Sequence, residues 1–421
     1  MIEWIGGSVI ILIVLFILYL RGNFYRKINY RMTDVPSFKA PHFTLAMMGV
    51  SGSSITRANL GKFCGQIDEI YAARLEAIRR ARRTIHFETF YMTPGRRADE
   101  FADAIIERSL NGVDVLLIVD SLGVSSMPKQ YWQRLRAGGI KVRFFHPLTW
   151  KYPLHYNNRT HRKLILIDGK IAFVGGMGVS DHWDGMPKIG DTEPWLDSEL
   201  SFTGAIVATL EGIFMQHWLY VGGVVSLSQE IFNPSKDGST IVIVTPSDNP
   251  TATSPVSALF YTSILAANKR IWLASPYFLP DKNSRRALLK AKKNGVDVRI
   301  LTVGAHNDKK LVYYGVRERY GDLLAAGIEI NEYQPSMMHA KVLLIDDAYV
   351  STGSTNLDPR SLFLNDELHL SMVEPLLAKV VEDFFLRGFK KSDRIEMQQW
   401  KTRPLWQRLL GHVVLFFRWQ L

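Results

Sequence analysis

A long internal repeat is the feature that most restricts how this chain can fold. The segment 111–115, Asn-Gly-Val-Asp-Val, recurs identically at 294–298, and the strand-like segment 82–91 has a counterpart at 269–278. In both copies, helical patterns that end at Asn-Gly alternate with runs rich in β-branched residues, which is typical of α/β units. The repeat therefore predicts two similar α/β domains that pack about a pseudo-twofold axis, with mixed sheets flanked by helices.

The repeat also divides the chain, because 421 residues exceed the usual size of one core. We expect the first domain at 46–240 and the second at 241–393. A transmembrane helix with a basic juxtamembrane segment is expected at 1–45, and an amphipathic membrane-interface segment at 394–421. The first copy holds an insertion at 148–160, between its proline and its histidine, where an added loop would shape a substrate entrance.

The N-terminal prediction depends on the uncharged run Trp4–Leu20, which as a helix would cover roughly 26 Å, near one hydrocarbon core. The basic residues after it favour a cytoplasmic location for the folded part of the chain. These residues are Arg21, Arg26, Lys27 and Arg31. The sequence thus predicts a single-pass protein of the cell inner membrane with a cytoplasmic catalytic domain.

The C-terminal segment 404–421 mixes aromatic residues such as Trp406 and Trp419 with Arg408 and Arg418. This pattern favours a helix in the headgroup layer of an acidic membrane. A terminal helix that only docks on the core remains the alternative.

Charge and cysteine content narrow the classes of partner and chemistry. The chain carries 51 Lys and Arg against 40 Asp and Glu, a net charge of +11, which favours an anionic partner such as nucleic acid or an acidic bilayer. Its single cysteine, Cys64, excludes an intramolecular disulfide and a metal site built from several thiolates.

One motif, H-x-K-x4-D-x6-G-(G/S), occurs in each copy with the same spacing. Its residues are His161, Lys163, Asp168, Gly175 and Gly176 in the first copy, and His339, Lys341, Asp346, Gly353 and Ser354 in the second. On an extended strand the histidine and lysine share one face. An imidazole can attack phosphorus or protonate a departing oxygen, and a lysine neutralises phosphoryl charge. If the copies share a site, the pattern predicts phosphodiester exchange.

These two motifs, with the contexts 157–163 and 172–177, resemble the phospholipase D superfamily and, within it, the bacterial cardiolipin synthase branch. The resemblance covers roughly residues 85–393. It implies that no metal or other cofactor is needed, that one histidine forms a covalent phosphatidyl adduct, and that the other transfers protons. By this resemblance we expect His161 to be the nucleophile and His339 the acid and base, although the symmetry leaves the reverse assignment open.

The resemblance also implies a carboxylate, further along each copy, that contacts the other ring nitrogen of the histidine. Glu199 and Glu367 are expected in this role. Asp168 and Asp346 complete the catalytic motifs, and we expect them to fix the motif loops rather than touch the substrate.

Three residues are expected to bind the substrate phosphate. They are Gly176, Ser354 and Asn356. The first copy departs from the family pattern, because Gly178 stands where the second copy has Asn356. One phosphate ligand would then be missing from the first copy.

The function implied is transfer of a phosphatidyl group from one phosphatidylglycerol to another, with release of glycerol. The expected partners are the anionic phospholipid and a membrane, with no nucleic acid, and self-association is left open. Two other enzymatic interpretations remain: a phospholipase D hydrolase that releases phosphatidic acid, and a membrane-tethered nuclease. A lipid-binding protein with idle motifs is a fourth interpretation.

Overall fold

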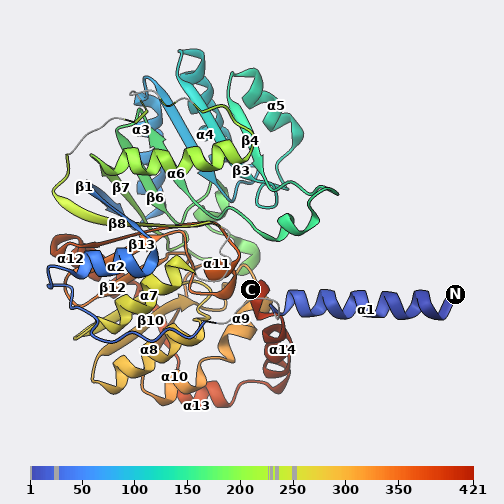
Figure 1. The fold of residues 1–421 in the computed structure, drawn as a ribbon, viewed down its shortest axis with the longest axis vertical. Coiled ribbons are helices and arrows are strands. Elements are labelled where there is room, and N and C mark those ends of the chain that lie inside the picture. The colour runs from blue at the N-terminus through green and yellow to red at the C-terminus, as the bar shows by residue number, and fades with distance from the viewer. Residues whose placement is uncertain (1, 23–27, 226, 228–230, 233–236, 249–253) are drawn as a thin grey trace.

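The computed structural model describes residues 2–22, 28–225, 227, 231–232, 237–248 and 254–421. Within these residues, two α/β halves share one mixed β-sheet (Figure 1). The strands of the first half are β1 (Ser54–Cys64), β2 (Thr84–Thr89), β3 (Asp114–Asp120), β4 (Lys141–Phe145), β5 (Leu164–Ile167), β6 (Ile171–Gly175) and β7 (Glu199–Thr203). Those of the second half are β8 (Thr240–Ser247), β9 (Arg270–Ala274), β10 (Asp297–Val303), β11 (Glu329–Tyr333), β12 (Val342–Ile345), β13 (Tyr349–Gly353), β14 (Glu367–Val373) and β15 (Ser392–Arg394).

Helices connect and cover these strands. In the first half they are α1 (Ile2–Leu20), α2 (Phe43–Ser51), α3 (Ile67–Arg80), α4 (Arg96–Leu110), α5 (Lys129–Ala137) and α6 (Ile206–Tyr220), with the short 3-10 helices η1 (Pro153–Asn157), η2 (Asp181–Asp184) and η3 (Pro187–Ile189). In the second half they are α7 (Pro255–Leu265), α8 (Lys282–Lys293), α9 (Lys310–Arg317), α10 (Gly321–Ala325), α11 (Pro359–Phe363), α12 (Pro375–Lys390), α13 (Met397–Lys401), α14 (Leu405–Phe416) and η4 (Arg418–Gln420).

The order of the strands reads the same from both sides of the β8–β1 pair. It runs β15-β11-β10-β9-β12-β13-β14-β8-β1-β7-β6-β5-β2-β3-β4. Apart from the added edge strand β15, each strand of one half thus has a counterpart at the same distance from the centre. The prediction of two repeated α/β domains is confirmed, and the antiparallel β1–β8 pair joins them into one sheet.

The repeated Asn-Gly pair ends a helix in both halves. α4 ends at Leu110 and α8 at Lys293, directly before the pair, and both Gly112 and Gly295 have a φ of 88°. Glycine adopts this left-handed conformation without the steric cost of a side chain, so the chain can turn sharply into the next strand. The parallel strands β3 and β10 follow immediately.

α1 does not meet the requirements of a membrane span. Among the residues whose placement is described, no helix has the length and apolar character needed to cross a membrane. The prediction of a single-pass inner-membrane protein is therefore wrong.

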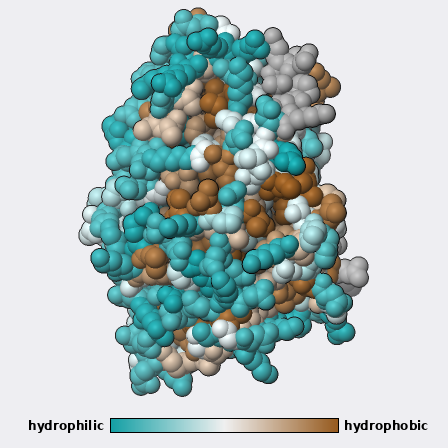
Figure 2. Space-filling view, turned by 90° about the vertical axis from the view of Figure 1, so that its left-hand side faces the viewer, coloured by the Kyte–Doolittle hydropathy of each residue, from teal (hydrophilic) through white to brown (hydrophobic). Residues whose placement is uncertain are grey.

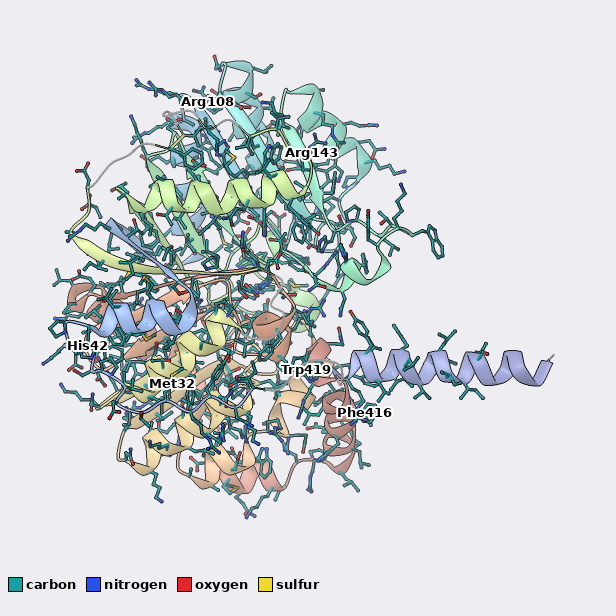
Figure 3. The ribbon with its side chains drawn as sticks, in the orientation of Figure 1. Met32, His42, Arg108, Arg143, Phe416 and Trp419 are labelled. Atoms are coloured by element: carbon teal, nitrogen blue, oxygen red, sulfur yellow. The ribbon has the colours of Figure 1, made fainter. Side chains whose placement is uncertain are left out.

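α14 packs on the second half along one side and is exposed along the other. Its Gly411 lies against α9, where an added Cβ would come within 2.7 Å of the Tyr314 carbonyl oxygen. Leu409 and Val413 remain 60% and 61% exposed. Figure 3 shows Phe416 and Trp419 where α14 and η4 meet the end of α1. Arg21, just after α1, lies 4.0 Å from the centre of the Phe416 ring.

The face turned away from α1 gathers hydrophobic atoms at its middle, between more hydrophilic upper and lower parts (Figure 2). On this side of the molecule α2 exposes Leu45 and Val50, and α12 exposes Leu376 and Val380 (Figure 1).

Candidate active site

The two motif loops cross the boundary between the halves. The backbone N–H of His161, ahead of β5, donates to the carbonyl oxygen of Asp366 at 2.8 Å. In the same way the N–H of His339, ahead of β12, donates to the carbonyl oxygen of Leu196 at 2.7 Å. Each motif histidine is thus fixed by backbone of the opposite half.

Both histidines line one cavity of about 330 Å³, together with Lys163. The Nζ of Lys163 donates to the carbonyl oxygen of His161 at 2.7 Å. The Nζ of Lys341 donates to the carbonyl oxygen of His339 and lies 3.0 Å from its Nδ1. The structure therefore brings together both histidines and both lysines predicted from the sequence.

A carboxylate from the opposite half contacts the Nδ1 of each imidazole. His161 Nδ1 lies 2.9 and 3.0 Å from the two carboxylate oxygens of Glu367, and His339 Nδ1 lies 2.8 Å from Oδ2 of Asp197. When Nδ1–H donates to the carboxylate, Nε2 keeps its lone pair. Each ring can then attack phosphorus or accept a proton through Nε2.

Glu199, the residue expected beside a histidine, contacts Arg74 instead. The Nε of Arg74 donates to both carboxylate oxygens of Glu199, at 2.9 and 3.0 Å, and both side chains are buried. The residue at the expected position beside His339 is Asp197, which was not predicted from the sequence.

The register of the strands explains this difference. β6 aligns Gly175 with Glu199, whereas β13 aligns the equivalent Gly353 with His369. Asp197 is therefore the counterpart of Glu367, and Glu199 is the counterpart of His369. Aligning the first copy on its motif glycines and the strand that follows would have identified Asp197.

The motif aspartates bind backbone away from the cavity. Asp168 accepts hydrogen bonds from the backbone N–H groups of Arg82, Arg83 and Thr84, at 2.7 to 3.1 Å. Asp346 accepts equivalent bonds from residues 268–270. This geometry agrees with a role in fixing the motif loops.

The three residues expected to bind phosphate occupy different positions. Asn356 lines the cavity, and its Oδ1 is buried without a hydrogen-bond partner. Ser354 donates through Oγ to Glu367, so it contacts the carboxylate that binds His161 and not His161 itself. The N–H of Gly176 donates to the carbonyl oxygen of Ser198 at 3.1 Å, and a Cβ at Gly176 would lie 2.2 Å from Oδ1 of Asp197.

The two His–carboxylate pairs differ in charge. Burial alone would raise the pKa of Asp197, but the charges of His339 and Lys341 outweigh it and lower that pKa to about 2. Burial raises the pKa of Glu367 to about 8, despite the opposing charge of Lys163. Burial and neighbouring positive charge lower the pKa of His339 to about 4 and that of His161 well below its usual range.

Burial also acts on the two lysines of the site. It lowers the pKa of Lys163 well below its usual range and that of Lys341 to about 8. A phosphate anion in the cavity would favour the charged forms of these lysines and of the histidines. The site is thus arranged to receive negative charge.

Aromatic rings form much of the cavity wall. Phe90 packs edge-on against His161, with ring centres 5.3 Å apart. Trp183 and Trp195 lie 5.5 and 5.8 Å from the ring of His339. These rings pack against both imidazoles and limit the other orientations that they could adopt.

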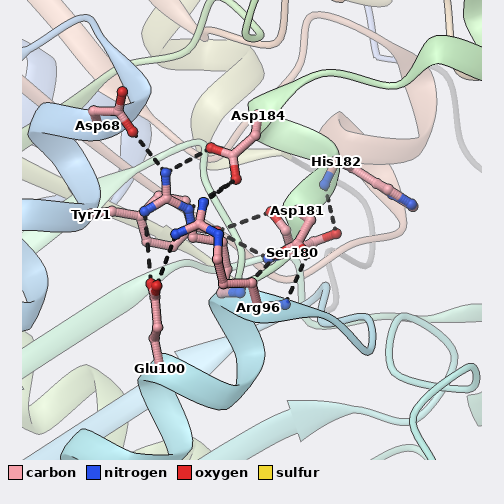
Figure 4. Close-up of polar contacts among 9 residues, drawn as sticks. Asp68, Tyr71, Arg96, Glu100, Ser180, Asp181, His182 and Asp184 are labelled. Carbon is pink, nitrogen blue, oxygen red and sulfur yellow. Dashed lines mark hydrogen bonds and ion pairs between the residues drawn. The ribbon is translucent and has the colours of Figure 1, made fainter.

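A polar network fixes η2, which carries His182 and Trp183 in the cavity wall (Figure 4). The carboxylate of Asp181 accepts from the backbone N–H groups of Arg96 and Arg97, at 2.9 and 2.7 Å. Arg97 also pairs with Asp184 at 2.7 Å. The start of α4 therefore positions this wall.

The insertion at 148–160 reaches the rim of the same cavity. Its Arg159 lines the cavity, while Trp150 is fully exposed. Asn157 donates through Nδ2 to the Tyr19 hydroxyl at 3.1 Å and accepts from Arg360. In the described part of the chain, no group of three or more His, Cys, Asp or Glu side chains is placed to hold a metal ion.

Comparisons with known proteins show which family the chain resembles. The family model of the cardiolipin synthase, PLD-like domain matches residues 75–182 and 260–388. A cardiolipin synthase of Alkalihalophilus pseudofirmus is 34% identical over 349 residues, which cover 81% of this chain and 68% of the relative. A probable cardiolipin synthase of Bacillus subtilis is 32% identical over 381 residues, covering 89% of this chain and 75% of the relative.

A solved structure supports the fold alone. The crystal structure of a phosphatidylserine synthase from Haemophilus influenzae superimposes with a TM-score of 0.69 at 15% identity, covering 90% of this chain and all of that one. The repeated fold and the paired motifs define a member of the phospholipase D superfamily. Within that superfamily, the chain belongs to the cardiolipin synthase family.

Proposed function

We propose that the protein transfers a phosphatidyl group from one phosphatidylglycerol to a second, producing cardiolipin and glycerol. The observation that carries this proposal is that two imidazoles from separate halves line one cavity, each with its Nδ1 against a carboxylate. Two groups that can exchange protons and bond to phosphorus are what a two-step transfer needs. The relatives named cardiolipin synthase support the choice of phosphatidylglycerol.

In the first step, Nε2 of His161 attacks the phosphorus of phosphatidylglycerol. The bond from phosphorus to the headgroup glycerol oxygen breaks, and protonated His339 donates its proton to that oxygen. Glycerol leaves, and the phosphatidyl group remains bonded to His161. Lys163 and Lys341 neutralise the phosphoryl oxygens as charge develops.

The choice of His339 as proton carrier is supported by Asp197. The negative charge of this buried carboxylate stabilises an imidazolium at 2.8 Å. In the second step, His339 takes a proton from a hydroxyl of the second phosphatidylglycerol, whose oxygen attacks phosphorus. The bond from His161 to phosphorus breaks, and cardiolipin forms.

Phosphate recognition is assigned to Asn356, which lines the cavity and can donate through Nδ2 to a phosphate oxygen, together with the motif lysines. Ser354 and Gly176 support the carboxylates Glu367 and Asp197, and Asp168 and Asp346 fix the motif loops.

We also propose that the protein meets its lipid substrate at a membrane surface through α14. Its exposed side includes Leu409, Val413 and Phe416, and η4 directly after it lines the catalytic cavity through Gln420. An apolar face beside the entrance would let the acyl chains remain in lipid while the headgroup enters.

The test is product identification. Purified protein given phosphatidylglycerol vesicles should release cardiolipin and glycerol in equal amounts, and single-stranded DNA should remain uncut. Phosphatidic acid as the sole lipid product would replace the transferase proposal with hydrolysis.

A further inference from the structure

A second cavity, of about 320 Å³, lies beside the catalytic one. Its walls come from residues 28–30, the first turn of α8, and from α11 and η4. Four basic side chains line it, and the mechanism proposed above uses none of them. They are Lys282, Arg285, Arg319 and Arg418.

The positive charge of this cavity is only partly balanced. Arg285 is buried and pairs with Asp322. Asp281 also lines the cavity, but its two oxygens accept from the N–H of Ser284 and from the hydroxyl of Ser257. Across the described residues, Arg319 and Arg418 pair with no carboxylate, and the sequence 23–27 that precedes the cavity contains no Asp or Glu.

These arginines are close enough to repel one another. Burial, and then the charge of Arg319, lower the pKa of Arg285 to about 10. Burial, followed by the charges of Arg319 and Arg21, lowers the pKa of Arg418. Guanidinium groups gathered in this way are matched in charge and geometry to phosphate oxygens.

One part of the remaining lining is apolar and continues toward exposed apolar side chains, whereas Asn29, Tyr30 and Asn283 add polar groups. Leu279, Phe363 and Trp419 face the cavity, and the rings of Phe363 and Trp419 lie 5.1 Å apart. α14 leads away from η4 with Val413 and Phe416 exposed (Figure 3). A ligand with both a phosphate and an acyl chain fits such a lining better than a free phosphate does.

One wall separates this cavity from the catalytic one. In α11, Pro359 and Phe363 face the second cavity, whereas Arg360 and Ser361 face the catalytic cavity. In η4, Arg418 faces the second cavity and Gln420 the catalytic one.

We propose that this cavity is a second lipid site, which binds the phosphate of an acidic phospholipid through Arg319 and Arg418 with its acyl chain toward Phe363 and α14. It is distinct from the site of phosphatidyl transfer. Its occupant contacts the α11–η4 wall from the side opposite to the reacting substrate.

The test counts binding sites for a soluble lipid. Titration calorimetry would use dihexanoyl phosphatidylglycerol below its micellar concentration and the full chain carrying His161→Ala, which prevents turnover. Adding Arg319→Gln with Arg418→Gln should remove one binding site, or weaken it by about tenfold or more. The matched control, Arg79→Gln with Arg82→Gln, changes the charge equally at exposed positions of the first half and should leave the count unchanged.

The loss of one site is expected whether or not the catalytic cavity also binds this lipid, so the result does not depend on the proposed reaction. Phe363→Ala should weaken the lipid at the same site while leaving any binding of inorganic phosphate unaltered. An unchanged number of sites with unchanged affinities in the arginine variant would overturn the proposal. Arginine-dependent binding of inorganic phosphate without binding of the lipid would also overturn it, and would identify a free-phosphate site.

Discussion

The Nδ1 atoms of His161 and His339 contact Glu367 and Asp197, so each imidazole depends on a side chain from the opposite half. Because the two rings have complementary tasks in the proposed transfer, neither can replace the other. We expect His161→Ala and His339→Ala each to lower kcat by about a thousandfold or more in an assay of cardiolipin formation. Near-normal turnover by either variant would contradict a shared site.

Substitutions at Asp197 and at Glu199, two residues apart, should affect different properties: the first should lower kcat and the second should lower the free energy of unfolding. Asp197→Asn removes the charge that stabilises the His339 imidazolium, so kcat should fall by about 100-fold with little change in the unfolding temperature. Glu199→Gln leaves buried Arg74 without its counter-charge, which should cost on the order of 2 kcal/mol in free energy of unfolding. Denaturant titration and steady-state kinetics on both variants check this contrast. Equal kinetic defects would contradict it.

The pH dependence of kcat/KM tests which histidine attacks. Attack by His161 requires Nδ1–H to donate to an ionised Glu367, whose pKa is raised to about 8, while departure of glycerol requires a protonated His339, whose pKa is lowered to about 4. The ionised fraction of Glu367 grows and the protonated fraction of His339 falls as pH rises from about 4 to about 8. Above that pH Lys341, with a pKa lowered to about 8, loses its positive charge. We expect kcat/KM to be nearly level between about pH 4 and 8 and to fall above pH 8.

Lys341→Arg keeps the positive charge and should weaken the fall on the alkaline side. A steady fall of kcat/KM between about pH 4 and 8 would favour His339 as nucleophile, because Asp197, with a pKa of about 2, is already ionised there and only the protonated fraction of His161 would change.

For individual residues, the sequence was informative where the motif spacing is the same in both copies, and misleading where it differs. The motif residues His161, Lys163, His339 and Lys341 could be predicted because identical spacing marks them in both copies. Asp197 was missed because Asp-Ser-Glu and Asn-Asp-Glu look alike when they are compared apart from the strand that follows, and the pairing of β6 with β7 shows which carboxylate is the counterpart of Glu367.

Among the elements, the antiparallel strands β13 and β14 show how closely neighbouring strands pack beside the active site. A Cβ on Gly353 would lie 2.3 Å from the Leu368 carbonyl oxygen, on the strand that presents Glu367. Gly353→Ala should therefore lower the free energy of unfolding by about 2–4 kcal/mol and also reduce kcat, because the strand must shift. Thermal unfolding and kinetics would be compared with Gly295→Ser, where no atom lies within 4 Å of the added Cβ but the φ of 88° is strained.

A Gly353 variant as stable as the original chain would show that β14 moves freely.

The helices and strands themselves were largely predictable, since Asn-Gly signals and β-branched runs mark their ends. The 3-10 helix η2 was not, because it depends on Asp181 reaching the backbone of α4, a contact between residues far apart in the sequence.

For the whole molecule, the exposed side of α14 is expected to govern access to lipid packed in a membrane. Leu409→Asp with Val413→Asp should lower turnover on phosphatidylglycerol vesicles by about tenfold, and should leave turnover of a soluble short-chain lipid unchanged. The matched control is Leu376→Asp with Val380→Asp on α12, which are also exposed. Equal losses on both substrates would mean that the variant disturbs the cavity rather than the membrane contact.

The repeat made the two-half architecture predictable, but the joining of both halves into one sheet through β1 and β8 was not predicted. The expected membrane span failed for a different reason. The hydropathy of a sequence segment describes its composition, and no helix among the described residues meets the requirements of a membrane span.

The exchange of carboxylates between halves has a consequence for how this chain can change. A substitution beside β7 is felt by the imidazole of the second copy, and one beside β14 by the imidazole of the first. A damaging substitution in either copy therefore impairs the histidine of the other copy as well, so both copies must be retained together for the reaction to proceed.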